Sequence, residues 1–232
     1  MAANRHKTKE IITTAKNTEF SLSKAIEKER YNFNGASLFS IFDDLLTYMI
    51  HGFTINEPPL PSWKHSQEEN AIFWELSLNI MAEYVKARHE KKPIDLFGTA
   101  YEELAAIGDK KHFGQFFTPL HICELMAQIC GNVEKKGDTV YDPTCGSGRM
   151  FLTKFKYDPN AICVGGDIDF TCVKMTALNL LLNGIEGCVY HMDSLKQTYL
   201  SDFCYVVNPM RATRGEDEIF CVRKEIKNEA SA

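Results

Sequence analysis

Residues 139–150, TVYDPTCGSGRM, decide the fold of this chain. They have the pattern of a short apolar strand, a glycine-rich loop and the start of a helix. A second strand, AICVGGDID, begins at residue 161, and the apolar helix FTCVKMTALNLLLNG follows it. Further strands are expected at CVYHMD (188–193), at FCYVVNP (203–209) and over 219–222. Strands that alternate with helices predict an α/β fold with a Rossmann-like, doubly wound parallel sheet.

The first half of the chain predicts a helical region instead. Apolar residues recur with the helical period over 36–51 and 67–92, and we expect two further helices over 21–30 and 95–107. The segments NFNG and NEPPLPS and the residue Pro93 separate these helices. We therefore divide the chain into an N-terminal helical region, residues 1–110, and an α/β domain, residues 111–232.

Composition excludes several classes of protein. The chain has 232 residues, 44% of them hydrophobic, and a net charge of −5, which is typical of a globular protein and gives no global basic field for nucleic acid. A signal peptide and a run of 18 apolar residues are both missing from the sequence, so a cytoplasmic protein without a membrane partner is expected. All eight cysteines lie between Cys123 and Cys221 without a CxxC pair, which favours buried, reduced thiols and no metal site.

Four polar residues stand where predicted strands end: Asp142, Asp167, Asp193 and Asn208. Ligands of open α/β sheets bind beyond the carboxyl ends of the strands, so these side chains are expected to converge on one crevice. A simpler alternative is that each caps a helix or a turn, as Asp and Asn often do. That alternative explains one or two of the positions more readily than all four.

The loop between the first strand and its helix points to a particular ligand. Gly146 and Gly148 let the backbone approach a ligand closely, but neither the phosphate-loop pattern nor GxGxxG is present. Asp142 suits an ammonium or sulfonium group, Asp167 can accept both ribose hydroxyls, and Asp193 can accept from an adenine amino group. The sequence therefore predicts a nucleoside with a cationic, amino-acid-like tail.

The order of these motifs resembles a known family. The chain carries DLFGTAYEEL (95–104), GQFFTP (114–119), DPTCGSG (142–148), GGDID (165–169), an acid in HMDSL and the pair Asn208-Pro209. Together they are similar to S-adenosylmethionine-dependent adenine-N6 DNA methyltransferases, most of all to the modification subunits of type I restriction systems. The resemblance covers residues 95–210, and it makes residues 111–232 an S-adenosylmethionine-binding methyltransferase domain.

The resemblance implies roles for individual residues. The methionine end of the cofactor would be held by the first of four groups of residues, and the second group would form the loop that wraps the cofactor. The third group would bind the ribose, and the fourth would bind the adenine. The residues implied are Phe117, Thr118 and Pro119; Asp142, Pro143, Cys145, Gly146, Ser147 and Gly148; Asp167 with Ile168; and Asp193 with Ser194. Asn208 and Pro209 would accept hydrogen bonds from the amine of a flipped-out adenine. DNA, a specificity subunit or another partner chain would be the partners.

Two departures from the family pattern affect these expectations. Met210 and Arg211 replace a second proline and an aromatic residue, and stacking on an aromatic ring is worth about 1–3 kcal/mol per base. Arg211 could stack on a base or contact phosphate instead, or it could simply be exposed. Few residues follow Pro209, so we expect an incomplete sheet with an open edge at its fourth strand and no target-recognition domain. An open edge has to be covered by a partner chain, by another copy of this chain or by the N-terminal helices, and we expect self-association or a missing partner.

Three functions remain open from the sequence. The first is an adenine-N6 DNA methyltransferase, or a subunit of one. The second is a protein that binds S-adenosylmethionine but is weak or inactive in catalysis, as a remnant or a partner-dependent subunit. The third is a methyltransferase that acts on a protein glutamine amide, which GQFFTP and the helical region before it disfavour.

Overall fold

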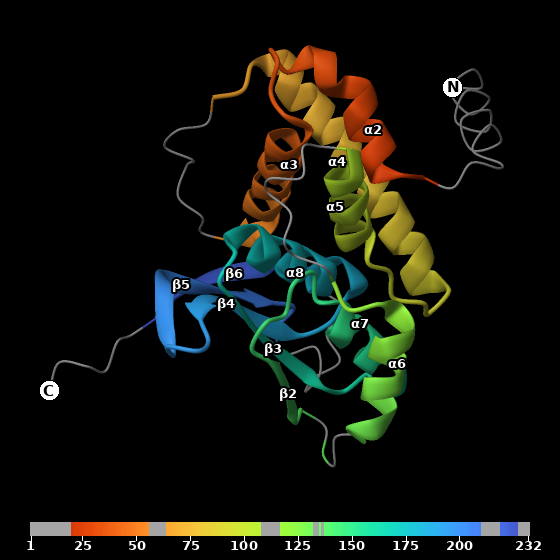
Figure 1. Ribbon diagram of the computed structural model, residues 1–232, viewed down its shortest axis with the longest axis vertical. Helices are drawn as coiled ribbons and strands as arrows, with labels where there is room; N and C mark the ends of the chain where they lie inside the picture. The colour runs from red at the N-terminus through yellow and green to blue at the C-terminus, as the bar shows by residue number, and fades with distance from the viewer. Residues whose placement is uncertain are drawn as a thin grey trace, which may run out of the picture.

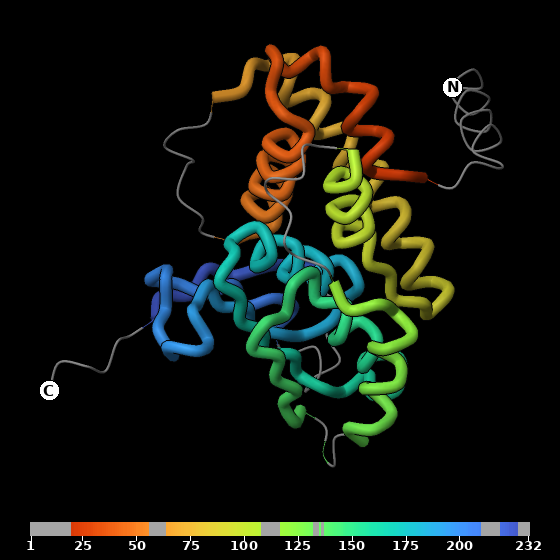
Figure 2. Tube along the Cα trace, viewed as in Figure 1, coloured from red at the N-terminus to blue at the C-terminus, as the bar shows by residue number. Residues whose placement is uncertain are grey.

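The computed structural model describes residues 20–55, 64–107, 117–131, 135, 137–209 and 219–226. Within these ranges, a group of helices packs against one face of a six-stranded sheet (Figure 1). Figure 2 shows that the early helices and the later sheet occupy separate parts of the molecule. Residues 114–116 of GQFFTP, Met210 and Arg211 lie outside the described residues.

The helices of the first half form where the periodicity predicts them. They are α2 (Leu22–Glu29), α3 (Leu38–Phe53), α4 (Gln67–His89) and α5 (Leu96–Ile107), with a short 3-10 helix at Arg30–Asn32. Serine side chains accept a backbone N–H at the starts of α2, α3 and α4. At α4, Ser66 and Glu69 form a reciprocal capping box, which satisfies two backbone donors that the helix itself leaves unpaired.

The sheet confirms the α/β class but is mixed rather than wholly parallel. Its strands are β1 (Thr54–Ile55), β2 (Thr139–Asp142), β3 (Ile162–Asp167), β4 (Gly187–Asp193), β5 (Thr198–Val207) and β6 (Cys221–Glu225), in the order β1-β6-β5-β4-β3-β2. Strands β2, β3 and β4 are parallel, as predicted, whereas β5 runs antiparallel to β4 and β6. Only residues 194–197 separate β4 from β5, and a parallel connection needs about a dozen residues or more.

The expected open edge at the fourth strand is also wrong. Strand β5 is an interior strand, because β6 pairs with it along Phe203 to Val207. The helical region then supplies β1, which pairs in parallel with β6 and sets Thr54 opposite Cys221. The first half of the chain therefore completes this side of the sheet, and the edge strands are β1 and β2.

Helix α8 (Phe170–Asn183) lies between the sheet and the helical region, and every residue from Cys172 to Asn183 is buried. Lys174 Nζ contacts Asp43 Oδ1 of α3 at 2.6 Å, and the Tyr84 hydroxyl of α4 donates to Asn179 Oδ1. Helices α6 (Leu120–Ile129) and α7 (Arg149–Tyr157) lie beside β2 and β3 (Figure 1). One apolar core runs through both halves, and the division at residue 110 stays a prediction.

Six of the eight cysteines are buried; Cys188 is partly exposed and Cys130 is exposed. Burial raises the pKa of the Cys163 thiol to about 12, as expected of an apolar core position. In the part of the chain that the structure describes, no three His, Cys, Asp or Glu side chains gather as a metal site. None of the helices described there is long and apolar enough to span a membrane.

Candidate functional site

The glycine loop turns sharply between β2 and α7. Gly146 and Gly148 have φ angles of 56° and 82°, a region that L side chains rarely adopt. A Cβ on Gly146 would lie 2.9 Å from Cδ1 of Phe117, so the loop touches the Phe117 segment directly. Cys145 N donates to Gly166 O at 3.0 Å, and Thr176 Oγ1 donates to Gly146 O at 2.8 Å. The loop is therefore held on both sides, by β3 and by α8.

Asp167 ends β3 directly beneath this loop. Its Oδ2 accepts from Gly146 N at 2.9 Å, and its Oδ1 accepts from Asp169 N at 2.9 Å. An ionised carboxylate offers about four acceptor positions, so each oxygen keeps capacity for one more donor. Burial raises the pKa of Asp167, although these backbone hydrogen bonds oppose the rise. The group can thus accept two hydroxyls of a ligand.

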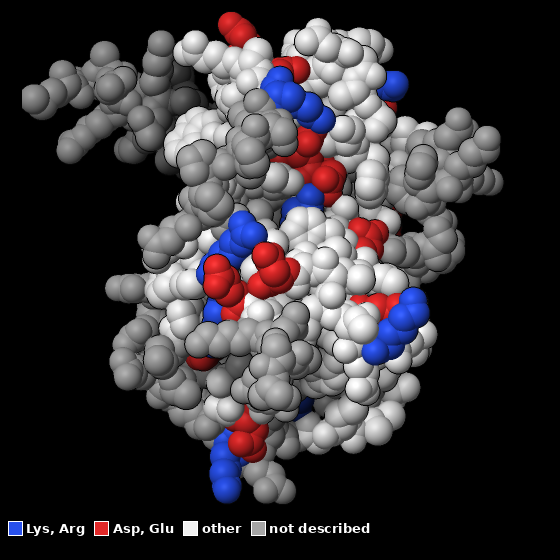
Figure 3. Space-filling model, turned by 90° about the vertical axis from the view of Figure 1, so that its left-hand side faces the viewer, with Lys and Arg blue, Asp and Glu red and all other residues white. Residues whose placement is uncertain are grey.

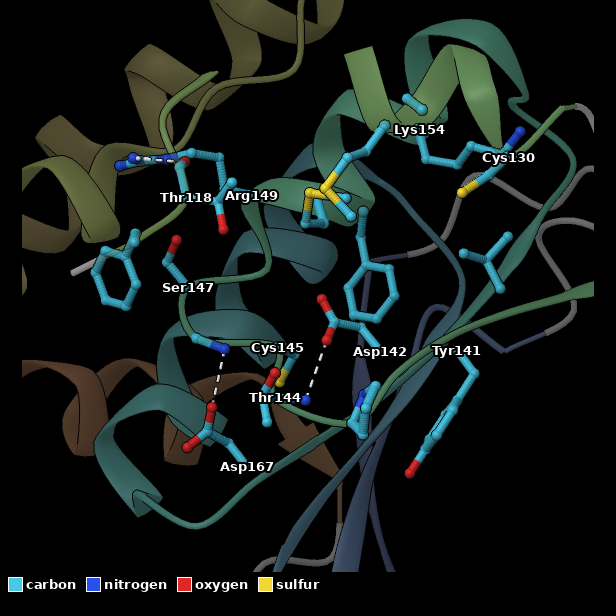
Figure 4. Close-up of a pocket in the computed structure, with 18 of the residues that line it drawn as sticks. Thr118, Cys130, Tyr141, Asp142, Thr144, Cys145, Ser147, Arg149, Lys154 and Asp167 are labelled. Carbon is cyan, nitrogen blue, oxygen red and sulfur yellow. Dashed lines mark hydrogen bonds between the residues drawn. The ribbon is translucent and has the colours of Figure 1, made fainter. Parts of the chain in front are cut away.

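Asp142 ends β2 on the other side of the loop. Its Oδ1 accepts from Thr144 N at 3.0 Å, which makes it a turn residue as well as a member of the site. Burial raises the pKa of this carboxyl too. Figure 4 shows the side chains of Asp142 and Asp167 on either side of the backbone between Thr144 and Ser147.

These groups share one cavity of about 910 Å³. Nine of the residues predicted to bind the cofactor line it: Phe117, Thr118, Asp142, Pro143, Cys145, Gly146, Ser147, Asp167 and Ile168. A volume of this size suits a ligand as large as a nucleoside with a tail. Pro119 and Gly148 do not line the cavity but follow Thr118 and Ser147 directly in the chain.

Asp193 and Ser194 lie at the end of β4 and join the site through the loop. Ser194 Oγ donates to the carbonyl of Pro143. Asp193 Oδ1 accepts from Leu195 N and Lys196 N at 3.1 and 3.0 Å, and its Oδ2 lies 3.2 Å from Lys196 Nζ. These backbone and side-chain contacts with Lys196 lower the pKa of Asp193. Asp193 therefore acts as a turn residue here and does not line the cavity.

Asn208 does not join the three aspartates. Because β5 is antiparallel to β4, Val207 pairs with Gly187, the first residue of β4, and Asn208 follows at the opposite end of the sheet from Asp193. Its side chain is buried, and Nδ2 donates to the carbonyls of Leu181 and Ile185, both at 3.0 Å, where α8 ends. Its Oδ1 is buried and has no hydrogen-bond partner among the residues that the structure describes. Pro209 follows Asn208, and both stand away from the cavity.

Sequence reasoning missed two charged residues of the site. Arg149 lines the cavity, and its guanidinium lies 5.7 Å from the Phe117 ring. Burial lowers its pKa, but hydrogen bonds and charges from Glu102 and Asp95 outweigh that and raise it. Asp95 belongs to DLFGTAYEEL, whose resemblance to the family was the only signal that could have drawn attention to it.

The fold and the site together define an α/β ligand-binding protein, with its cavity at the carboxyl ends of parallel strands beside a glycine loop. The sequence profile of the family described as N-6 DNA Methylase matches residues 92–211, just over half of the chain. The chain belongs to this family.

The chain matches only a minor part of the length of each individual relative. The chain is 35% identical over 105 residues to a type I restriction enzyme MpnII methylase subunit from Mycoplasma pneumoniae, covering 42% of this chain and 19% of the relative. It is 27% identical over 174 residues to the MjaVIII methylase subunit from Methanocaldococcus jannaschii, covering 71% of this chain and 28% of the relative. The chain thus spans about a fifth to just over a quarter of these relatives.

A solved structure shows a partial likeness as well. It is the methyltransferase subunit of a type I restriction-modification system from Streptococcus thermophilus, at 23% identity and a TM-score of 0.42. The alignment covers 83% of this chain and 44% of that one.

Proposed function

We propose that this chain binds S-adenosylmethionine in the cavity beside the glycine loop, as the cofactor-binding part of an adenine-N6 DNA methyltransferase. The observation that carries the proposal is the pair of carboxylates that line the cavity, the partly buried Asp142 and the buried Asp167, on either side of a loop whose left-handed turn at Gly146 favours glycine. Family membership supports the same reaction class.

The chemistry of the donor set fits this cofactor. Asp167 has acceptor capacity for the two ribose hydroxyls, and Ile168, 60% exposed beside it, offers an apolar surface. Asp142 supplies a negative charge for the ammonium or sulfonium end. Phe117, Thr118 and Pro119 would hold the methionine end. For Asp193 and Ser194 to serve the adenine, the end of β4 would have to move toward the cavity, which neither residue lines. S-adenosylmethionine, when bound, supplies an electrophilic methyl group.

The target side of the reaction is proposed from the resemblance alone. Asn208 and Pro209 would orient an adenine amine by accepting its hydrogen bonds. For this role their segment has to leave the carbonyls of Leu181, in α8, and of Ile185, just beyond it, to which the Asn208 amide donates. That burial favours a second candidate function: a chain that binds S-adenosylmethionine and depends on another chain or segment for catalysis.

DNA and a specificity subunit are proposed partners, because the relatives carry the name of type I methylase subunits. The net charge of −5 gives little general attraction to DNA. On the face in Figure 3, basic and acidic side chains of the described residues are interspersed rather than gathered by sign. A proposed partner chain would therefore carry most phosphate contacts, whether it is a specificity subunit or a second copy.

Two assays on the purified chain test this function. Calorimetric titration with S-adenosylmethionine should show one site per chain. Transfer of a tritiated methyl group to DNA free of N6-methyladenine should then be measured with and without added specificity subunit. Binding with transfer by the chain alone supports the first candidate. Binding with transfer only when the specificity subunit is added, or without transfer in either condition, supports the second. No binding contradicts both.

A further inference from the structure

The carboxylate of Asp95, at the start of α5, makes an unusual number of contacts. Its side chain is only 9% exposed. Oδ1 accepts from Gly98 N and from Asn179 Nδ2, both at 2.8 Å. Oδ2 accepts from Ser147 Oγ at 2.7 Å and from Arg149 Nε at 2.8 Å. One buried carboxylate of the helical region thus holds four donors, and a buried charge is tolerated only when it is paired in this way.

Two of these donors belong to the wall of the cavity. Ser147 lies in the glycine loop, and Arg149 is the first residue of α7. Asn179 reinforces the same point, because its Nδ2 also donates to Ser147 O at 2.7 Å. Asp95 therefore fixes both the side-chain and the backbone position of Ser147.

Arg149 extends the contact to the other wall. Its Nη2 lies 3.0 Å from Glu102 Oε2. Its Nη1 donates to Thr118 O at 3.4 Å (Figure 4). Thr118 and Phe117 line the cavity opposite the loop. The two walls come from segments far apart in the sequence. They meet where Gly146 approaches Phe117 and where Arg149, paired with Asp95, donates to Thr118 O.

The space around Asp95 is filled as well. A Cβ on Gly98 would lie 2.3 Å from Asp95 Oδ2 and 2.5 Å from Ser147 Oγ. The first turn of α5 therefore packs its backbone directly against this contact, which leaves little freedom for either side chain.

The charges have a further consequence for a cationic ligand. Two positive side chains line the cavity, Arg149 and Lys154. Asp95 and Glu102 together compensate Arg149, and Asp158 Oδ2 lies 3.6 Å from Lys154 Nζ. The carboxylates of Asp142 and Asp167 also line the cavity, and neither forms an ion pair with another residue that the structure describes. Without Asp95, the positive charge of Arg149 would act more strongly on a ligand cation.

We infer that Asp95 is a positioning residue for the cofactor: through Ser147 and Arg149 it sets the glycine loop against the Phe117–Thr118 segment, so that the helical region is part of the binding site. This inference rests on the proposed binding of S-adenosylmethionine. It assigns to the helical region a role in ligand affinity rather than in packing alone.

The substitution Asp95→Asn tests the inference. It keeps the shape, but its amide nitrogen cannot accept from Arg149 Nε if the oxygen continues to accept from Gly98 and Asn179. We expect the Kd for S-adenosylmethionine, measured by calorimetry well below the melting temperature, to rise at least tenfold. In the unliganded chain, amide hydrogen exchange of residues 142–149 should become faster while α3 and β4 keep their protection.

Asp43→Asn is the matched control. Asp43 is also a carboxylate of the helical region, and it pairs with the buried Lys174 of α8 at 2.6 Å and with Thr171 Oγ1 at 2.7 Å. It does not line the cavity. This variant should lower the melting temperature but leave the Kd and the exchange of residues 142–149 within twofold of the original chain.

A double-variant comparison separates positioning from stability. If Asp95 acts through Arg149, the double variant of Asp95→Asn with Arg149→Gln should raise the Kd little more than Arg149→Gln does. Ser147→Ala removes only the hydrogen bond from Ser147 Oγ to Asp95 Oδ2 and replaces Asp95→Asn as the test variant if that variant fails to fold. It should raise both the Kd and the rate of amide hydrogen exchange in residues 142–149.

Two results would overturn the inference: an unchanged Kd and loop exchange in Asp95→Asn and Ser147→Ala, or an equal change of both quantities in Asp43→Asn. Absence of binding by the original chain would instead contradict the proposed function. In that case loop exchange in the unliganded variants still decides whether Asp95 positions the loop.

Discussion

The two ends of the central sheet differ in what their polar residues do. At one end, Asp142 and Asp167 follow parallel strands, share a cavity and keep acceptor capacity for a ligand. At the other end, Asn208 follows an antiparallel strand, and its amide donates to the last carbonyls of α8. A polar residue at the end of a strand thus has acceptor capacity for a ligand at one end of the sheet, whereas at the other end its side-chain amide is used in hydrogen bonds within the fold. Strand direction, which a motif does not encode, makes the difference.

The largest expected effect is the loss of ligand binding at the first end. Asp167→Ala removes both acceptors for the ribose and the partner of Gly146 N, so we expect the affinity for S-adenosylmethionine to fall about 100-fold or more. Calorimetric titration measures this. Asp169→Ala is the control: its carboxylate caps α8 by accepting from Thr171 N and does not line the cavity, so the variant should lose stability and keep its affinity. Equal losses in both variants would show that Asp167 does not contact the ligand.

Asn208→Ala should have the reverse effect at the second end. Three hydrogen bonds, to the carbonyls of Leu180, Leu181 and Ile185, are lost, and we expect the free energy of unfolding to fall by about 1–3 kcal/mol. Affinity for S-adenosylmethionine should stay within twofold. Denaturant unfolding measures the change, and Asn32→Ala, which removes an exposed contact with Glu29, should alter stability by about 0.5 kcal/mol or less. Unchanged stability in Asn208→Ala would contradict the burial of this amide.

These two residues also show how far sequence can predict this molecule. The glycine loop, Asp142 and Asp167 could be placed because a strand, a tight loop and a helix are local features. The direction of β5 was missed, although the short distance between Asp193 and the next strand was a usable signal for a hairpin. Strand β1 pairs with β6 through only two pairs of residues, which lie far apart in the sequence. No local pattern predicts such a pairing.

Gly146→Ala tests the loop itself. The substitution forces a side chain into a φ angle of 56° and to within 2.9 Å of Phe117, so affinity should fall about tenfold and stability by about 1–2 kcal/mol. Gly35→Ala is matched, since Gly35 has a φ angle of 78° but open space around it. That control should lose stability alone. A loop variant that binds normally would indicate that Phe117 and the loop do not enclose the ligand.

The smallest expected effect is a dependence of affinity on pH. Burial raises the pKa of Asp142 and of Asp167, so both accept protons at a higher pH than an exposed Asp, whose pKa is about 3.9. Because a cationic ligand needs them ionised, affinity should fall several-fold as the pH drops through these raised values. In the unliganded chain the sign is opposite: these groups favour the folded state most at low pH, and that contribution is lost as the pH rises through the raised values.

Titrations between pH 7 and pH 4.5 measure this dependence, with uncharged adenosine as the comparison. Adenosine lacks the cationic tail and should show a weaker dependence on pH. An equal dependence for both ligands would remove the assigned role of Asp142.

The most direct test of the contrast between the two ends is to locate the bound cofactor. Ultraviolet irradiation of the chain with methyl-tritiated S-adenosylmethionine, followed by peptide mapping, marks the residues that the methyl end touches. Label is predicted in peptides that contain Phe117 and Thr118 or residues 142–149. Label in the peptide that contains Asn208 would contradict the separation of the two ends on which this account depends.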